Sequence, residues 1–173
     1  MNESFLLVSD ALPGISLRSA APSDCDDLRA WKNENRQYFF FRDLISADGQ
    51  RQWFAGYRQR PDDWMFMVLD QDRSIGCMGF RARDGQADVY NVILGRAEHG
   101  GRGVMSGAFR MMCSFARERL GVPVVARVLK TNPALGWYRK RGFDVVGDQD
   151  EHVMIALGER FEPVAVSRKE WTS

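Results

Sequence analysis

The sequence contains no long apolar run. No stretch approaches the roughly 20 apolar residues that a helix needs to cross a bilayer. The apolar segment Phe5–Val8 is too short for the core of a signal peptide, and no basic region precedes it. We therefore expect a cytoplasmic protein that does not bind a membrane.

Cysteine is scarce as well. The three cysteines, Cys25, Cys77 and Cys113, are odd in number and far apart in the chain. This pattern matches neither a disulfide framework nor the ligand spacing of a zinc site. The sequence therefore predicts no disulfide and no metal centre.

Neither sign of charge is in excess. The chain has 24 basic and 23 acidic residues and a formal net charge of +1, which argues against general binding of nucleic acid. No repeat, low-complexity segment or linker interrupts the 173 residues, of which 45% are hydrophobic and 27% charged. These values are typical of a soluble globular chain, and we expect one domain over residues 1–173.

A glycine-rich loop at residues 98–103 joins an expected strand at 87–94 to an expected amphipathic helix at 104–120. Glycines let the backbone approach a ligand, and a helix N-terminus attracts anions. Arg102 adds a full positive charge. This junction therefore predicts a phosphate-binding loop, with a simple tight turn as the alternative.

Two common phosphate motifs are missing from this loop. When the dinucleotide-binding motif G-x-G-x-x-G is aligned on Gly101 and Gly103, its third glycine position is occupied by Ser106. A P-loop needs a Gly-Lys pair, and the chain has none.

The remaining elements follow from periodicity and from turn residues. Ser23 and Ser46 are expected to cap two helices, and Pro133 to begin a third that ends at Arg141. No structure is assigned to residues 1–14 or 158–173. The expected strands are 15–18, 64–69, 74–81, 87–94, 124–129, 143–146 and 153–157.

This order of elements and two motifs resemble the GNAT acyl-CoA N-acetyltransferase family over residues 15–157. The family's loop motif, Q/R-x-x-G-x-G/A, overlays Gly100, Gly103 and Met105. Two of these three positions depart from the pattern. The missing Gln or Arg side chain puts one phosphate contact in doubt, whereas Arg102 and the backbone amides remain.

The second motif is Asn132–Phe143. It resembles the family element N-x-x-A-x-x-x-Y-x-x-x-G-F with one residue missing between Asn132 and Ala134. The resemblance implies an α/β (α+β) fold in which a mixed sheet splays between the parallel strands 88–94 and 124–129. About four helices flank this sheet.

In this family acetyl-CoA lies in the split between the two parallel strands. The resemblance implies that free backbone groups of residues 92–94 pair with the pantetheine arm and that the loop amides hold the pyrophosphate. Arg139–Arg141 is expected to form a solvated face, with contact to the CoA 3′-phosphate as the alternative. The implied cofactor contacts are Val92, Ile93, Leu94, Gly100, Gly101, Arg102, Gly103, Val104, Met105, Ser106, Asn132 and Tyr138.

The resemblance also implies roles in catalysis. Tyr138 matches the family tyrosine that protonates the CoA sulfur, a task that suits a phenol because it keeps its proton at neutral pH. Packing in the core is the alternative for Tyr138, and helix capping is the alternative for Asn132. Asn91 is expected to position a water, and the general base is left unassigned.

The acceptor is expected near Trp31, Phe40 and Tyr90. The segment Trp31–Asn33 resembles GNAT subgroups that acetylate nucleotide-linked amino sugars, the acceptor we favour, and others that modify protein N-termini. A small-molecule amine, a catalytically silent acyl-CoA sensor and a nucleotide-binding regulator remain alternatives. A homodimer also remains open.

Overall fold

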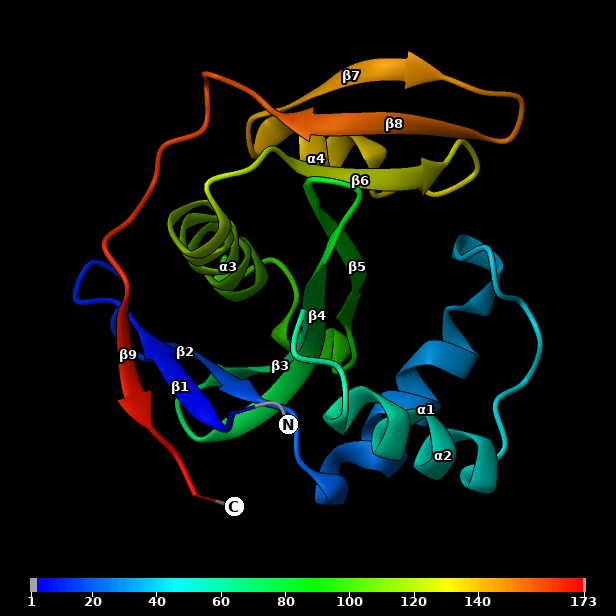
Figure 1. Cartoon of the computed structure of the whole chain (residues 1–173), viewed down its shortest axis with the longest axis vertical. Helices are drawn as coiled ribbons and strands as arrows, with labels where there is room; N and C mark the ends of the chain where they lie inside the picture. Colours follow the sequence, from blue (N-terminus) through cyan, green and yellow to red (C-terminus); the bar gives the residue numbers. More distant parts are fainter. Residues whose placement is uncertain (1–2, 173) are drawn as a thin grey trace.

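The computed structural model describes residues 3–172 and contains one nine-stranded mixed sheet (Figure 1). The strand order is β7-β8-β6-β5-β4-β3-β2-β1-β9. The strands are β1 Phe5–Val8, β2 Ile15–Ser19, β3 Asp63–Asp70, β4 Arg73–Arg83, β5 Gln86–Leu94, β6 Val124–Leu129, β7 Phe143–Asp148, β8 His152–Leu157 and β9 Ser167–Glu170. The four α-helices of the described chain are α1 Cys25–Glu34, α2 Ala47–Arg58, α3 Val104–Leu120 and α4 Leu135–Lys140.

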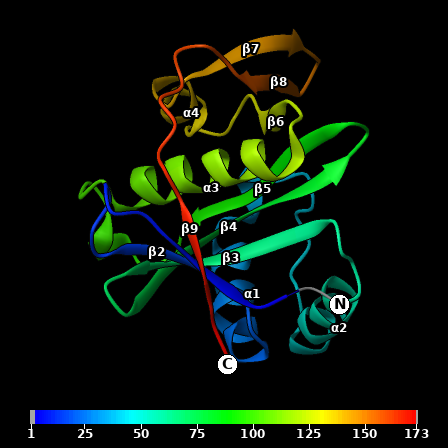
Figure 2. The same ribbon diagram turned by 60° about the vertical axis from the view of Figure 1, so that its left-hand side comes forward.

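Helices cover both faces of the central strands. α3 lies on one face, and α1 and α2 lie on the other (Figures 1 and 2). The middle of strand β3 is apolar at every position because both of its faces are covered: Phe66 and Val68 belong to the cluster under α3, whereas Met65 and Met67 belong to the cluster under α1 and α2. Successive side chains point to opposite faces, so a strand covered on both sides needs apolar residues at every position.

The sheet splits between β5 and β6. These two strands pair in parallel only from Ala87 opposite Val124 to Val89 opposite Ala126, although β5 continues to Leu94 and β6 to Leu129. Beyond Val89 the strands diverge, so one edge of β5 loses its partner. The predicted fold, a mixed sheet splayed between two parallel strands, is confirmed.

A β-bulge in the β4–β5 pair sits beside this split. The register shifts between Cys77 and Gly79, and Asn91 on the opposite strand has a φ of 50°. A bulge adds an unpaired residue and turns the strand locally. The bulge therefore coincides with the point at which β5 leaves β6.

The helix starts agree with the sequence in part. Ser46 is the N-cap of α2 and accepts a hydrogen bond from Gly49 N at 3.0 Å. The prediction for Ser23 is wrong, because a short 3-10 turn, Pro22–Asp24, precedes α1. The Asp24 carboxylate takes the capping role there and accepts from Ala21 N at 2.7 Å. α4 begins two residues later than predicted, after a turn in which Asn132 Oδ1 accepts from Ala134 N at 2.9 Å.

The two terminal segments of the described chain meet at one edge of the sheet. β1 lies between β2 and β9 and is antiparallel to both. Sequence patterns predicted no structure here, and the four residues of β9 are all exposed. Without an apolar alternation, a short edge strand cannot be recognised from its sequence.

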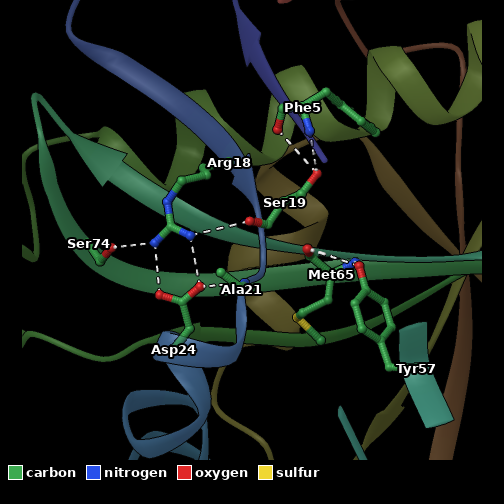
Figure 3. A network of polar contacts seen from close by, with 8 residues as sticks. All are labelled: Phe5, Arg18, Ser19, Ala21, Asp24, Tyr57, Met65 and Ser74. Carbon is green, nitrogen blue, oxygen red and sulfur yellow. Dashed lines mark hydrogen bonds and ion pairs between the residues drawn. The ribbon is translucent and has the colours of Figure 1, made fainter. Parts of the chain in front are cut away.

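A polar network fixes the turn from β2 into α1 (Figure 3). Arg18 makes two bonds of 2.8 Å to the Asp24 carboxylate and a longer contact of 3.4 Å to Ser74 Oγ. The side chains of Arg18 and Asp24 are only 13% and 9% exposed, so this ion pair lies largely inside the protein. It joins β2, the start of α1 and the start of β4.

Candidate active site

Three adjoining cavities run along the split strand β5. The loop cavity, about 620 Å³, lies between β5, the glycine loop, α3 and α4. The split cavity, about 420 Å³, lies between β5 and β6. The helix cavity, about 510 Å³, lies between α1, α2 and β5. Val92 and Tyr138 line both the loop and split cavities, and Asn91 lines both the split and helix cavities.

The glycine loop lines the loop cavity at the N-terminus of α3. Gly101 and Gly103 have φ values of 73° and 79°, a conformation that side chains rarely adopt. The amides of the first helical turn lack partners within the helix. The cavity is lined by Gly100, Gly101, Gly103, Val104, Met105 and Ser106, together with the β5 residues Val92 and Leu94.

Arg102 and Arg141 are placed differently from the prediction. Arg102 is not among the residues that line the loop cavity, and its Nη1 lies 3.2 Å from the Asp70 carboxylate. Arg141, expected on a solvated face, lines this cavity instead. It donates to Ser106 Oγ and lies over the Trp137 ring at 4.6 Å. No local pattern separates Arg141 from its basic neighbours, since only folding brings α4 beside α3.

Tyr138 lies where the loop and split cavities meet. Its ring packs edge-on against Phe109 and Phe143, with centroids 5.6 and 5.9 Å away. Burial raises the pKa of Tyr138 further above its ordinary value, and nearby Cys113 adds to this effect. The phenol therefore keeps its proton at neutral pH.

The family model described as "Acetyltransferase (GNAT) domain" matches residues 15–143, about three quarters of the chain. The chain belongs to the GNAT acetyltransferase family. A search of curated protein sequences finds no match.

Solved structures of GNAT proteins share the fold. FdhC, a nucleotide-linked sugar GNAT, aligns with a TM-score of 0.72 and 15% identity over 92% of each chain. RimL, the ribosomal L7/L12 alpha-N-protein acetyltransferase, in complex with coenzyme A, aligns with a TM-score of 0.68 and 18% identity over 83% of this chain and 92% of its own. Spermidine N-acetyltransferase from Vibrio cholerae, in complex with CoA and spermine, aligns with a TM-score of 0.69 and 19% identity over 83% and 93%.

In this GNAT enzyme the bulge on β5 contacts α1. Asn91 Oδ1 accepts a hydrogen bond from Lys32 Nζ, and Cys77 Sγ lies 3.4 Å from Asn91 O. Burial lowers the pKa of Lys32 to about 8, with Arg81 adding to this effect and Cys77 opposing it. Asn91 and Lys32 both line the helix cavity and the split cavity.

Two of the three residues predicted to contact the acceptor line the split cavity, and the third does not. Tyr90 lines the helix and split cavities and donates to the Asp63 carboxylate. Phe40 lines the split cavity and packs edge-on against His152 at 5.2 Å. Trp31 is only 4% exposed and packs so closely on Gly95 that a Cβ there would collide with its ring. Trp31 therefore belongs to the core and not to the lining of these cavities.

Two other residues complete the description of the site. Asn132 lines the split cavity, and its Oδ1 closes the turn before α4, although the N-cap of that helix is Ala134 and not Asn132. Ile93 is buried and lines the helix cavity, on the opposite side of β5 from Val92 and Leu94.

Among residues 3–172 no cluster of three metal-ligating side chains occurs, and no helix is long and apolar enough to cross a membrane.

Proposed function

We propose that this chain transfers the acetyl group of acetyl-CoA to the primary amine of an acceptor. The observation that carries the proposal is the loss of pairing between β5 and β6 after Val89, which opens a cavity lined by the β5 edge, the glycine loop and Tyr138. The family and the fold support acyl transfer, and the position of the cavity supports acetyl-CoA as the donor.

The loop cavity suits the donor's phosphates. We propose that the amides of residues 101–106 bind the pyrophosphate, since glycines with positive φ and a helix N-terminus present N–H groups to an anion. Arg141 supplies a positive charge in the same cavity, a role that we now favour over one for Arg102. The free backbone groups of residues 92–94 would pair with the pantetheine arm.

Tyr138 is proposed as the general acid. The neutral amine attacks the thioester carbonyl, a backbone N–H at the β5 edge stabilises the oxyanion, and collapse of the intermediate releases the CoA sulfur. The Tyr138 hydroxyl gives its proton to that sulfur as the C–S bond breaks. Asn91 is proposed to position a water that receives the proton lost by the amine.

The acceptor is proposed to occupy the helix cavity and to reach the split cavity. Tyr90 and Phe40 offer aromatic faces that could cover a sugar ring or stack on a base. An amino sugar, nucleotide-linked or free, is the acceptor class we favour, and a protein N-terminus is the second candidate. Trp31 has no place in this proposal because it lies in the core.

Calorimetric titration with acetyl-CoA tests the donor. Thiol release is then measured with a panel of amines that includes amino sugars, spermidine and a peptide with a free N-terminus. Binding followed by turnover supports the proposal. Binding without turnover on any of these amines supports the silent acyl-CoA sensor, and absence of binding contradicts the proposed donor.

The role of Tyr138 is tested with Tyr138→Phe. We expect kcat to fall about 100-fold, the size typical of a lost general acid, while affinity for CoA stays unchanged. Tyr57→Phe is the matched control, since Tyr57 is also buried but lies in the cluster under α1 and α2. Unchanged kcat in Tyr138→Phe would remove Tyr138 from the mechanism.

A further inference from the structure

Two cations face the acceptor side of the site. Lys32 on α1 and Arg81 on β4 line both the helix cavity and the split cavity. Among residues 3–172 neither side chain forms an ion pair, and no Asp or Glu lines the helix cavity. Neither charge therefore has an ion-pair partner among these residues, although Asp63 and Asp88 lie opposite Arg81 on the neighbouring strands.

The partners of these cations are neutral. Lys32 Nζ donates to the amide oxygen of Asn91 and lies 3.3 Å from the centre of the Phe39 ring. The Arg81 guanidinium lies over the Tyr90 ring at 4.1 Å, and its buried Nε has no hydrogen-bond partner in the described part of the chain. An amide oxygen and aromatic faces hold a cation in place but do not cancel its charge.

The nearest acidic groups are already occupied. Asp63, only 2% exposed, accepts from the Tyr90 hydroxyl and pairs with Arg60 Nε at 2.8 Å. In the split cavity, Asp88 pairs with Arg127 at 3.0 Å. Arg127 thus has a carboxylate within ion-pair distance, whereas Lys32 and Arg81 have none among residues 3–172.

We propose that Lys32 and Arg81 bind a negatively charged group of the acceptor, either a phosphate ester or a carboxylate. Burying a charge is unfavourable unless an opposite charge compensates it, and the ligand would supply that charge. Because both cations line the split cavity as well, the anionic group lies near the reacting amine. A polyamine would meet like charges here and bind poorly. This inference rests on the proposed function, since it concerns the acceptor of that reaction.

Matched pairs of acceptors test the inference by turnover. Glucosamine is compared with glucosamine 6-phosphate, alaninamide with alanine, and spermidine serves as the polycation. We expect at least about tenfold higher kcat/KM for an anionic member over its match, the effect of one charged hydrogen bond. The pair that responds distinguishes a phosphate from a carboxylate. Equal or better turnover of the neutral amines or of spermidine would overturn the inference.

Variants then assign the preference to the two side chains. In Lys32→Met and in Arg81→Gln, the ratio of kcat/KM for the anionic acceptor to kcat/KM for its neutral match should fall about tenfold or more. Lys130→Met is the control, because Lys130 is exposed and pairs with Asp148. A preference that survives both substitutions contradicts the assignment.

Lysine labelling gives a readout that needs no turnover. The chain has only four lysines, Lys32, Lys130, Lys140 and Lys169, so trace labelling with acetic anhydride and mass spectrometry follows each one. We expect glucosamine 6-phosphate or alanine to slow labelling of Lys32 several-fold relative to its neutral match and to leave the other three unchanged. If no amine is acetylated but this protection occurs, the proposed function fails while the anion site stands. If neither anionic compound protects Lys32, the inference is wrong.

Discussion

Lys32 carries its ammonium group into a half-buried position between α1 and β5. Desolvation disfavours the charged form, which is the main reason that its pKa falls to about 8, and Arg81 acts in the same direction. The unfolded chain binds this proton up to its ordinary pKa of 10.5. Between these two values the unfolded state holds more protons, so stability should rise with pH.

This argument predicts a pH-dependent difference between the wild type and Lys32→Met. Below pH 8 the variant should be the more stable, because it buries no charge. The difference should shrink as the pH rises from about 8 towards 10.5. Urea unfolding across this range measures it, with Lys130→Met as the control. A difference that does not depend on pH would show that Lys32 is well solvated.

The Arg18–Asp24 pair is the second residue whose environment predicts a measurable effect. Asp24→Ala should lower the free energy of unfolding by about 3 kcal/mol, because it leaves the Arg18 charge buried without its partner. Asp148→Ala removes an exposed partner of Lys130 and should cost less than about 1 kcal/mol. Denaturant unfolding of both variants tests the contrast, and equal losses would contradict it.

At the level of elements, the start of α3 depends on the backbone of Gly103. Its φ of 79° suits glycine, and a Cβ at this position would meet no neighbouring atom. The only cost of a side chain is therefore conformational, about 1–2 kcal/mol for one residue in the left-handed region. Relief of that strain would turn the loop amides away from a bound phosphate.

Gly103→Ala is accordingly expected to lower stability by about 1 kcal/mol and to weaken CoA binding about tenfold or more. Gly136→Ala is the matched control: Gly136 lies inside α4, its added Cβ also meets nothing, and its φ is not positive. That variant should gain about 0.5–1 kcal/mol, since alanine favours a helix interior over glycine. Calorimetry and urea unfolding test both changes. Unaltered CoA affinity in Gly103→Ala would contradict the proposed phosphate loop.

At the level of the whole molecule, the segment 158–166 ties the two ends of the sheet together. It leaves β8, crosses α3 and reaches β9 beside β1 (Figures 1 and 2). Phe161 and Val164 are buried in the main cluster along the way. Val164 N donates to Ser114 Oγ at 3.0 Å, and Arg110 on α3 donates to Pro163 O at 3.3 Å.

Two truncations should therefore differ sharply in stability. Removal of residues 167–173 deletes the exposed strand β9 and should cost little stability, although it uncovers the edge of β1. Removal of residues 159–173 also deletes Phe161 and Val164, and each buried side chain of this kind contributes about 1.5–3 kcal/mol. Urea unfolding ranks the two. Equal losses would show that the crossing segment contributes nothing to the core.

The sequence by itself determined the elements that local rules govern. Ser46 caps α2 because its side chain reaches an amide three residues away, and the glycines at 101 and 103 mark a loop because only glycine takes that backbone conformation freely. The apolar periodicity of 104–120 and the turn residues of the β3–β5 hairpins likewise act within a few residues. The family resemblance then indicated a mixed sheet that splits between two parallel strands.

The tertiary structure decided what depends on segments far apart in the chain. β1 and β9 pair across more than 150 residues although β9 has no apolar pattern of its own, and the Trp31 ring packs directly against the backbone of Gly95. Arg141, at the end of α4, donates a hydrogen bond to Ser106 on α3, and Lys32 and Arg81 line the same helix cavity. Each of these contacts joins surfaces that chain folding brings together, so neither spacing nor residue type could reveal it.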